Sequence, residues 1–401
     1  MNATPLRITY LLMSWPMPSQ PFAISDVLAL QNLGHSVTVR ALRPAQPEHL
    51  AAAREYGLTL DERSHPTWKG TGSVAVQPRN LGLAARLAGV IARHVGRSGG
   101  QLVRATALIP RLVDIADEMR DDPPDVVHAF WGHYPALALP LVEQIAPKAV
   151  RSMFLGAYDL TTHFLPAAPH LAGTSHTVFT HAAENLELLA ERGVDPARVT
   201  VVPRGIPLDL ANTPAAEKEP GLILTAANFQ KAKNIDRIID AMPMVLAKHP
   251  GARLEIAGDG AEREALKAQV ERLDLAEKVT FLGMLPREAL FARMRAATIF
   301  AFASTKPSER LPNVVKEAML ARCHIITSHT PGIEALVEDG VTGEIARDIA
   351  PEALAQRIGA ALVEKKQETS GPLSEKHIRD NFSAEAAMER YVDRWRGGAG
   401  V

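Results

Sequence analysis

Residues 298–343 read TIFAFASTKPSERLPNVVKEAMLARCHIITSHTPGIEALVEDGVTG, and this stretch decides the fold. It opens on an apolar run at 299–302, continues through a polar loop, and shows helical apolar spacing from Pro312. The pattern therefore predicts a strand, a loop and a helix in that order. A helix that starts after a strand presents unpaired N–H groups and the positive end of its dipole, which together favour a phosphate.

Two carboxylates flank the predicted start of this helix. Glu309 stands before it and Glu317 within its first turns, with seven residues between them. Carboxylates repel phosphate, so beside such a site they are better suited to accept hydrogen bonds from neutral hydroxyls, as acidic residues do from ribose. One anion site between two such acids describes a nucleotide-sugar pocket. The alternative is a pair of solvated surface charges, the usual situation of isolated charged residues.

The wider sequence resembles the C-terminal half of retaining glycosyltransferases of family 4. The similar segments are Glu309-x7-Glu317 with residues 311–314 inside it, residues 331–334 and residues 338–343. The resemblance is specific over roughly residues 198 to 345 and weaker elsewhere. It implies an α/β protein with the GT-B fold, in which two doubly wound, Rossmann-like domains face a cleft.

Length and composition agree with this expectation and exclude other classes. A chain of 401 residues can hold two domains, and 46% apolar with 22% charged residues is typical of globular proteins. A net charge of −1 provides no overall field for nucleic acid. Cys323 is the single cysteine, which excludes an intrachain disulfide and fits a reducing cytoplasm. We expect a cytoplasmic protein, because the sequence shows neither a signal peptide nor an apolar run of about 18 residues.

The expected domain organisation follows from apolar runs and one polar linker. Residues 8–13 and 36–42 predict buried parallel strands around a helix from about Phe22 to Leu33, a βαβ unit that begins a doubly wound sheet. Residues 212–220 are polar and without periodicity, so we expect the linker there. The expected domains are residues 1–211 for the acceptor and 221–379 for the donor, with a helix at about 380–401 packing back on the first.

Residues 63–113 contain eight cations and no acidic residue. Two sets of arginines recur there every seven residues, near one helical face: Arg79, Arg86, Arg93 and then Arg97, Arg104, Arg111. One interpretation is a basic surface over 79–111 for anionic lipid or a lipid-linked acceptor, with the protein peripheral at the inner face of a membrane. The other is a solvated face whose charges pair with acids elsewhere in the fold. Glycines within the segment predict two helices rather than one.

The resemblance also implies roles for individual residues. Glu317 would hold the ribose hydroxyls and Glu309 the sugar hydroxyls. Lys233 and the helix start after Arg310 would stabilise the departing diphosphate. The other residues expected at the donor site are Asn228, Gly258, Leu311, Pro312 and Asn313.

Three positions depart from the family pattern. Asn228 stands where an arginine directed at the diphosphate is expected, and Gly156 where a histidine beside the donor sugar is expected. His133, just after a predicted strand, is a candidate catalytic residue in place of that histidine, as is His163. Arg310, at a position that is commonly glycine, would supply the cation that Asn228 lacks.

The sequence thus predicts a retaining glycosyltransferase that moves a sugar from a nucleoside-diphosphate-sugar to the hydroxyl of a saccharide or lipid-linked acceptor, in cell-surface polysaccharide or glycolipid synthesis. We expect no metal and no cofactor, because no Asp/Glu cluster has metal-ligand spacing and the nucleotide-sugar is a substrate. Two alternatives stay open. One is a protein that binds nucleotide-sugar or a partner without transfer, and the other is a nucleotide-sugar 2-epimerase of the same architecture.

Overall fold

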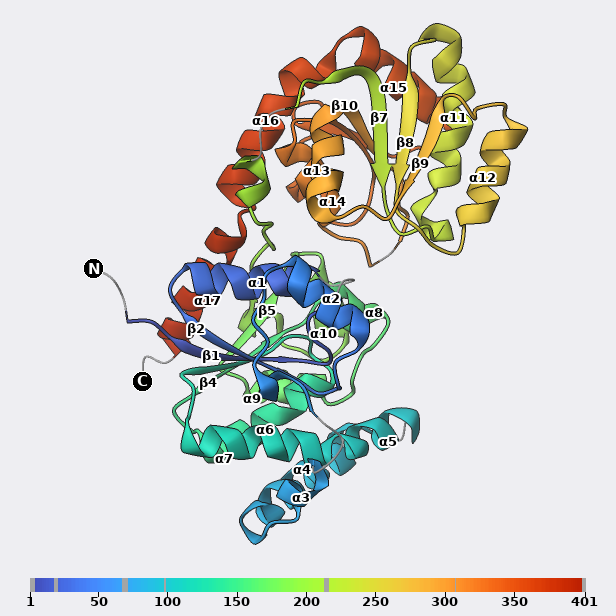
Figure 1. Cartoon of the computed structure of the whole chain (residues 1–401). Helices are drawn as coiled ribbons and strands as arrows, with labels where there is room; N and C mark the ends of the chain where they lie inside the picture. The colour runs from blue at the N-terminus through green and yellow to red at the C-terminus, as the bar shows by residue number, and fades with distance from the viewer. Residues whose placement is uncertain are drawn as a thin grey trace. The chain divides into compact units, whose positions relative to one another are not determined.

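The computed structural model describes residues 4–17, 21–66, 71–96, 99–212, 216–306 and 308–398. These residues fold into two compact units (Figure 1). The first unit contains the chain up to Arg204 together with the last helix from Ala384, and the second contains Gly205–Ser383. Each unit is built around a six-stranded parallel sheet that carries an apolar cluster on either face.

The first sheet has the strand order β2-β1-β3-β4-β5-β6. The run predicted at 8–13 forms β1, whose Ile8 lies beside Val37 of β2 and Val126 of β3. Leu11 and Tyr10 of β1 belong to different apolar clusters, so both faces of the sheet are buried and the strand is apolar throughout. The strands are β1 (Arg7–Leu12), β2 (Ser36–Ala41), β3 (Val126–Ala129), β4 (Val150–Phe154), β5 (Thr177–Thr180) and β6 (Val199–Val201).

The last helix packs on the first unit. α17 (Ala384–Gly398) lies against α1 (Pro21–Asn32), β4 and β5. Tyr391 stacks on Phe179 with ring centroids 3.8 Å apart, and the Trp395 indole donates to the Ser152 hydroxyl over 2.9 Å. Further helices of this unit are α2 (Pro47–Glu55), α3 (Thr71–Ala75), α4 (Leu81–His94), α5 (Gly99–Ala107), α6 (Ile109–Asp121), α7 (Leu139–Ile145), α8 (Ala157–Thr161), α9 (Ala168–Thr174) and α10 (Asn185–Glu191).

The basic segment contains separate helices α4 and α5, as its glycines predict. α4 turns Leu83, Leu87 and Ile91 inward, which leaves its arginines on the outer face. Three cations of the segment pair with acids: Arg79 with Asp117 at 2.6 Å, Arg86 with Glu143, and Arg111 with Asp114 at 2.6 Å. Arg93 and Arg104 are exposed and have no ion-pair partner within the described part of the chain. Lys69 and Arg97 lie outside the described residues.

The second sheet has the order β12-β11-β10-β7-β8-β9, again with parallel neighbours. Its strands are β7 (Glu219–Ala226), β8 (Arg253–Ala257), β9 (Val279–Gly283), β10 (Ala297–Phe302), β11 (His324–Ser328) and β12 (Gly343–Ala346). Its helices are α11 (Ile235–Lys248), α12 (Arg263–Arg272), α13 (Arg287–Ala296), α14 (Asn313–Leu320), α15 (Pro351–Val363) and α16 (Lys366–Asn381). The stretch quoted first forms β10, the loop after it, α14, β11 and the start of β12 (Figure 1).

The units divide between Arg204 and Gly205 and between Ser383 and Ala384. Of the linker expected at 212–220, residues 213–215 lie outside the described residues, and Glu219 already belongs to β7. Ile206 pairs with Ser383 in an isolated parallel bridge, and the Ile206 N–H donates to the Phe382 carbonyl over 2.8 Å. The two chain segments that leave the second unit are therefore joined to each other within it.

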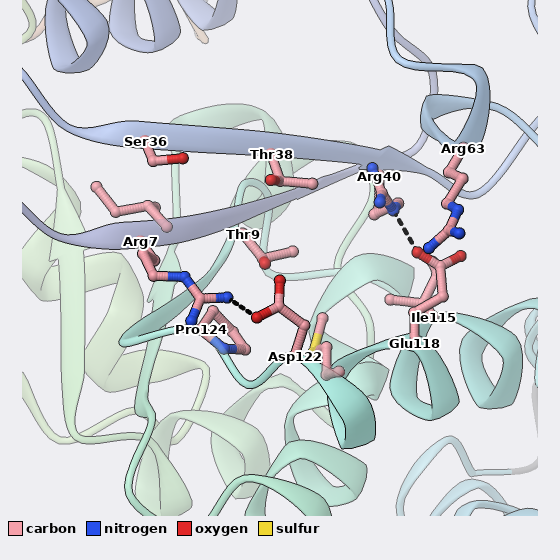
Figure 2. Close-up of a pocket in the computed structure, with 12 residues that line it drawn as sticks. Arg7, Thr9, Ser36, Thr38, Arg40, Arg63, Ile115, Glu118, Asp122 and Pro124 are labelled. Atoms are coloured by element: carbon pink, nitrogen blue, oxygen red, sulfur yellow. Dashed lines mark hydrogen bonds and ion pairs between the residues drawn. The ribbon is translucent and has the colours of Figure 1, made fainter.

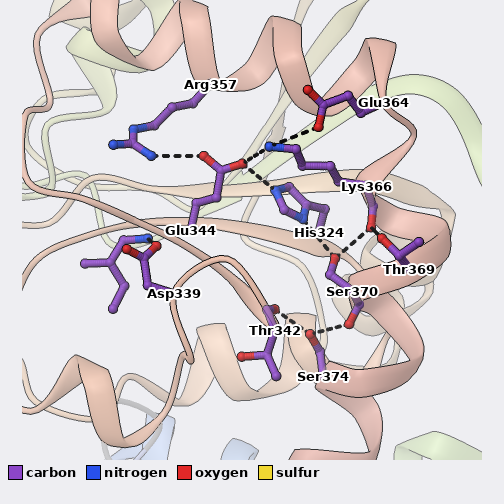
Figure 3. A network of polar contacts seen from close by, with 11 residues as sticks. His324, Asp339, Thr342, Glu344, Arg357, Glu364, Lys366, Thr369, Ser370 and Ser374 are labelled. Atoms are coloured by element: carbon purple, nitrogen blue, oxygen red, sulfur yellow. Dashed lines mark hydrogen bonds and ion pairs between the residues drawn. The ribbon is translucent and has the colours of Figure 1, made fainter.

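A charged network fastens α15 and α16 to the edge strand β12 (Figure 3). Glu344 accepts hydrogen bonds from Lys366 at 2.8 Å and Arg357 at 3.0 Å, and His324 lies 3.3 Å from the same carboxylate. The other ring nitrogen of His324 meets the Ser370 hydroxyl at 2.8 Å. These contacts hold the pKa of Glu344 at about 2, below its usual 4.5, with the His324 contact as the largest cause.

Candidate active site

The strand order of the second sheet reverses between β7 and β10, so the loops after these strands lie side by side. Ligands of doubly wound sheets bind at such a point, beyond the carboxyl ends of the strands. The Thr305 N–H donates to the Ala232 carbonyl over 2.8 Å. Asn234, in the left-handed conformation before α11, donates from its amide to the Ala303 carbonyl at 2.9 Å and the Thr305 hydroxyl at 3.0 Å. The two loops are thus tied together by backbone and side chain.

Lys233 and Glu309 meet at this junction. The Lys233 ammonium donates to Oε2 of Glu309, and the Ser304 hydroxyl donates to the same oxygen over 3.0 Å. The ammonium also lies 5.2 Å from the centre of the Phe302 ring, a cation–π contact. Both side chains of the pair are mostly buried, with 13% and 17% exposed. The structure therefore brings together two residues that the family resemblance assigns to one donor.

Glu317 lies in α14, where Pro312 is the N-cap. Its side chain is partly buried, and its carboxylate has no hydrogen-bond or ion-pair partner among the described residues. Burial raises the pKa of Glu317 from 4.5 to about 7, and the Arg287 and Lys316 cations offset only part of that rise. Arg287, the first residue of α13, is itself held by both oxygens of Asp209 at 3.1 and 2.9 Å. Glu317 is an acceptor whose hydrogen-bonding capacity remains available to a ligand.

The turn after β8 lies directly against the loop after β7. Gly258 has a φ of 127°, and a Cβ there would come within 1.9 Å of the Ala227 carbonyl oxygen. A Cβ on Gly260 would lie 2.6 Å from Oδ1 of Asn228. Only glycine fits this approach. Asn228 itself is exposed, at the edge of the junction.

The start of α14 is close to the same carboxylate. Arg310 is buried, and its Nη1 donates to the Glu309 carbonyl oxygen over 3.2 Å. Leu311 is buried in the apolar cluster beneath, and Oδ1 of Asn313 accepts from Lys316 at 3.2 Å. Arg310 therefore does not extend into solvent, and its guanidinium lies beside the Glu309 backbone.

In the first unit, His133 follows β3 next to the point where that sheet reverses between β1 and β3. Its Nδ1 is buried and has no hydrogen-bond partner among the described residues. Burial, together with His163 and Arg43 nearby, lowers the pKa of His133 to about 3, so the ring is neutral at neutral pH. A neutral imidazole can donate or accept a hydrogen bond but supplies no charge.

The neighbourhood of Gly156 gives a physical reason for the missing family histidine. A Cβ on Gly156 would lie 2.8 Å from the Phe154 ring and 3.0 Å from the Trp131 ring. Trp131 and Phe154 pack edge to face, 5.9 Å apart. The rings occupy the space into which a larger residue at position 156 would extend. His163 lies edge-on to Tyr158 at 4.8 Å.

A pocket of about 140 Å³ lies elsewhere in the first unit, between β1, β2 and α6 (Figure 2). Arg7 and Ser36, the first residues of β1 and β2, line it, so it lies at the amino ends of these strands. Four of the charged residues that line it form ion pairs, Arg7 with Asp122 and Arg40 with Glu118. It contains none of the predicted site residues, and ligands of such sheets bind at the opposite end.

Sequence reasoning missed several residues that organise the junction of the loops after β7 and β10. Ser304 donates a hydrogen bond to the Glu309 carboxylate, and Asn234 joins the two loops through the Ala303 carbonyl. The Phe302 ring lies against the Lys233 ammonium. In the sequence, only their positions mark them: Phe302 ends β10, Ser304 follows it closely, and Asn234 directly precedes α11. No group of three or more His, Cys, Asp or Glu suited to a metal ion occurs within the described ranges. In the same part of the chain, no helix is long and apolar enough to span a bilayer.

Comparison with known proteins agrees with this architecture. Residues 210–376 match the family described as glycosyl transferases group 1. The chain is 24% identical over 391 residues to the amylovoran biosynthesis glycosyltransferase AmsK of Erwinia amylovora, covering 90% of this chain and 91% of AmsK. It is 31% identical over 254 residues to a glycogen synthase of Mycobacterium tuberculosis, covering 58% and 59% of the two chains.

Among solved structures, Alr3699/HepE of Anabaena, in complex with UDP and glucose, aligns with a TM-score of 0.69. The alignment has 16% identity and covers 98% of this chain and all of the other. The fold is thus that of the GT-B class of glycosyltransferases, as the resemblance implied. Residues 210–376 thus match the glycosyl transferases group 1, as the resemblance to family 4 implied, and the chain is a glycosyltransferase enzyme.

Proposed function

We propose that this enzyme transfers a sugar, with retention of configuration, from a nucleoside-diphosphate-sugar to a hydroxyl acceptor in exopolysaccharide or other cell-surface glycan synthesis. The observation that carries the proposal is the contact between the loop after β7 and the loop after β10. One cation, Lys233, and two carboxylates, Glu309 and Glu317, lie there beside a helix start. The similarity to AmsK over nine-tenths of the chain supports the exopolysaccharide assignment.

The donor is assigned to the second unit. Glu317 accepts hydrogen bonds from the ribose hydroxyls, because its carboxylate has capacity that no described residue uses. Lys233, Arg310 and the backbone of residues 311–313 face the diphosphate, and Glu309 orients the sugar through its hydroxyls. The loops at Asn228 and Gly258 border the nucleotide. Since Alr3699/HepE binds UDP, uracil nucleotides are the first donors to test.

The proposed chemistry requires no separate base. The bond between the anomeric carbon and the phosphate oxygen breaks as the bond to the acceptor oxygen forms. The acceptor's proton passes to the departing phosphate. Lys233 and the helix start stabilise the charge that grows on the leaving diphosphate, and this stabilisation lowers the barrier. His133, neutral at neutral pH, is proposed to hold a substrate hydroxyl by a hydrogen bond.

The acceptor is assigned to the first unit, as a saccharide or a lipid-linked saccharide. Arg93 and Arg104, exposed and without an ion-pair partner among the residues that the structure describes, support contact with an anionic bilayer that carries such an acceptor. The apolar Leu81 and Val103, 54% and 68% exposed, lie on the same pair of helices. Arg79, Arg86 and Arg111 are paired with acids and are not part of this proposal.

A second candidate function is nucleotide-sugar binding without transfer. It is favoured by the surroundings of Gly156, where Trp131 and Phe154 leave no space for the expected histidine. It shares the donor site with the first candidate. Measured turnover therefore separates the two functions, whereas binding alone does not.

The donor-site assignment is tested by calorimetry with UDP, ADP and GDP at pH 8, where Glu317 is ionised. For the nucleotide that binds, Glu317→Ala is expected to weaken binding about ten- to a hundredfold, since a hydrogen bond to a charged group contributes roughly 1.5–3 kcal/mol. The matched control is Glu277→Ala, an exposed acid on the loop before β9. Equal affinities for wild type, Glu317→Ala and the control would remove Glu317 from the ribose site.

A further inference from the structure

The two side chains assigned to different parts of the donor are bound to each other in the structure. Lys233 donates to Glu309 Oε2, although the proposed function requires Lys233 at the diphosphate and Glu309 at the sugar. A diphosphate carries more charge than a carboxylate and forms stronger charge-assisted hydrogen bonds with an ammonium. The donor and Glu309 therefore compete for the same cation.

We propose that donor binding exchanges the partner of Lys233: its ammonium passes from Glu309 to the diphosphate, while Ser304 holds the freed carboxylate in place for the sugar hydroxyls. This inference rests on the proposed function. It adds a positioning residue, Ser304, and a coupling between the diphosphate and the sugar-reading carboxylate.

The contacts around Ser304 suit this role. Its side chain is fully buried, and its hydroxyl donates to the same Oε2 that accepts from Lys233. Its carbonyl oxygen accepts from the Ser328 hydroxyl at 2.6 Å, so neighbouring strand β11 fixes the backbone that carries it. When Lys233 turns to the phosphate, Ser304 still holds Oε2, and Glu309 does not swing away from the site.

The loop that carries Lys233 is held independently of Glu309. Asn234 ties it to Ala303 and Thr305, and the Thr305 N–H ties it to Ala232. Only the Lys233 side chain therefore needs to move, over its own flexible stem. Glu309 then weakens diphosphate binding in the wild type, because the ammonium must leave it first.

The test is a double-mutant cycle with UDP as the calorimetric probe, or with ADP or GDP if one of these binds instead. Lys233→Met should weaken binding tenfold or more. Glu309→Gln should tighten binding roughly three- to tenfold, the coupling expected of two groups in direct contact. In the Lys233→Met background, Glu309→Gln should change the affinity less than twofold, because no cation remains for the carboxylate to hold.

Two results would overturn the exchange while leaving the donor site in place. One is an affinity that Glu309→Gln leaves unchanged or weakens. The other is equal tightening with and without Lys233, which would indicate simple repulsion between Glu309 and the phosphates. If the wild type binds none of the three nucleotides, the proposed function itself fails, and the exchange with it.

Ser304 is tested by separating turnover from binding. Ser304→Ala should lower kcat for the accepted donor roughly tenfold and leave the nucleoside-diphosphate Kd within twofold, since only the sugar-reading carboxylate loses its support. Ser308→Ala, in the same loop, is the matched control and should change neither quantity. A loss of affinity in proportion to kcat, or an equal effect of Ser308→Ala, would refute the positioning role.

Discussion

Glu309 and Glu317 are the same residue type in one motif, yet their surroundings differ. Glu309 is bound by Lys233 and Ser304, whereas Glu317 has no partner among the described residues and a pKa raised to about 7. The spacing of the two acids was enough to predict that both flank one helix start. It could not indicate the Lys233–Glu309 pair, because 76 residues separate these two positions in the chain.

The residues that sequence reasoning missed have no signal of their own. A serine in a loop, such as Ser304, is usually solvated, and only the packing of β10 against β11 buries it. The missing histidine at Gly156 was visible in the sequence, but its cause was not. That cause is the packing of Trp131, in the loop after β3, against Phe154, the last residue of β4.

At the residue scale, we expect Arg310 to replace in part the arginine that is absent at position 228. Arg310→Gln and Lys233→Met should each lower kcat/KM about ten- to a hundredfold, the loss expected for one charge-assisted hydrogen bond. The double variant should depart from the product of the single effects, because the two cations share one anion. Steady-state kinetics of the three variants with one donor is the measurement, and thermal unfolding checks that buried Arg310 is not required for folding. A folded Arg310→Gln with wild-type kinetics would contradict the replacement.

At the scale of elements, the apolar runs predicted the strands well, but they did not predict strand ends that consist of polar residues. β7 starts at Glu219, three residues before its apolar run at 222–226, because Glu219 is neutralised by Arg253 and by Arg293 at 3.1 Å. Similarly, the arginines of the basic segment 63–113 were visible in the sequence, but their ion-pair partners were not. Glu143 and Asp117, which pair with Arg86 and Arg79, lie outside the acid-free segment and meet it only in the folded chain.

The Glu344 network predicts an acid-dependent contribution to stability. The pKa of Glu344 is about 2 in the folded protein, against 4.5 for a free carboxyl group, which corresponds to up to about 3 kcal/mol of stabilisation above pH 4.5. This stabilisation is lost as the pH falls toward 2. Glu344→Gln should therefore lower the free energy of unfolding at pH 7 by about 2–3 kcal/mol and have little effect near pH 2. Urea titrations followed by circular dichroism, with exposed Glu271→Gln as the control, measure this. If the free energies of unfolding of Glu344→Gln and wild type differed by the same amount from pH 7 to pH 2, the stabilisation would not come from the ionised Glu344 carboxylate.

The outer face of α4 and α5 predicts salt-sensitive membrane binding. The wild type should sediment with anionic phosphatidylglycerol vesicles at low salt and be released at high salt. Each exposed arginine contributes about 1 kcal/mol, so Arg93→Gln with Arg104→Gln should weaken partitioning roughly thirtyfold. Arg79→Gln is the control, since Asp117 already neutralises Arg79. If the wild type stays in the supernatant at low salt, the solvated-face interpretation applies to all these arginines.

For the molecule as a whole, the length and the apolar runs predicted two α/β domains, and the family resemblance implied that both are doubly wound. The exact boundaries between the two units were harder to predict. The chain enters the second unit after Arg204 and leaves it after Ser383, without a long polar linker at either point. The fold does not specify which substrates the protein uses. The sugar, the base and the acceptor are selected by loop side chains that differ among proteins of the same fold.

The central claim is transfer from a nucleoside-diphosphate-sugar, and product formation tests it most directly. The purified chain is incubated with a panel of UDP-, GDP- and ADP-sugars, and free nucleoside diphosphate and the anomeric form of the sugar product are measured. We predict release from one donor class, with water or a simple alcohol as a slow acceptor, retention of configuration, and a loss of at least tenfold in Lys233→Met. Release from no donor, or equal release by Lys233→Met, would contradict the account.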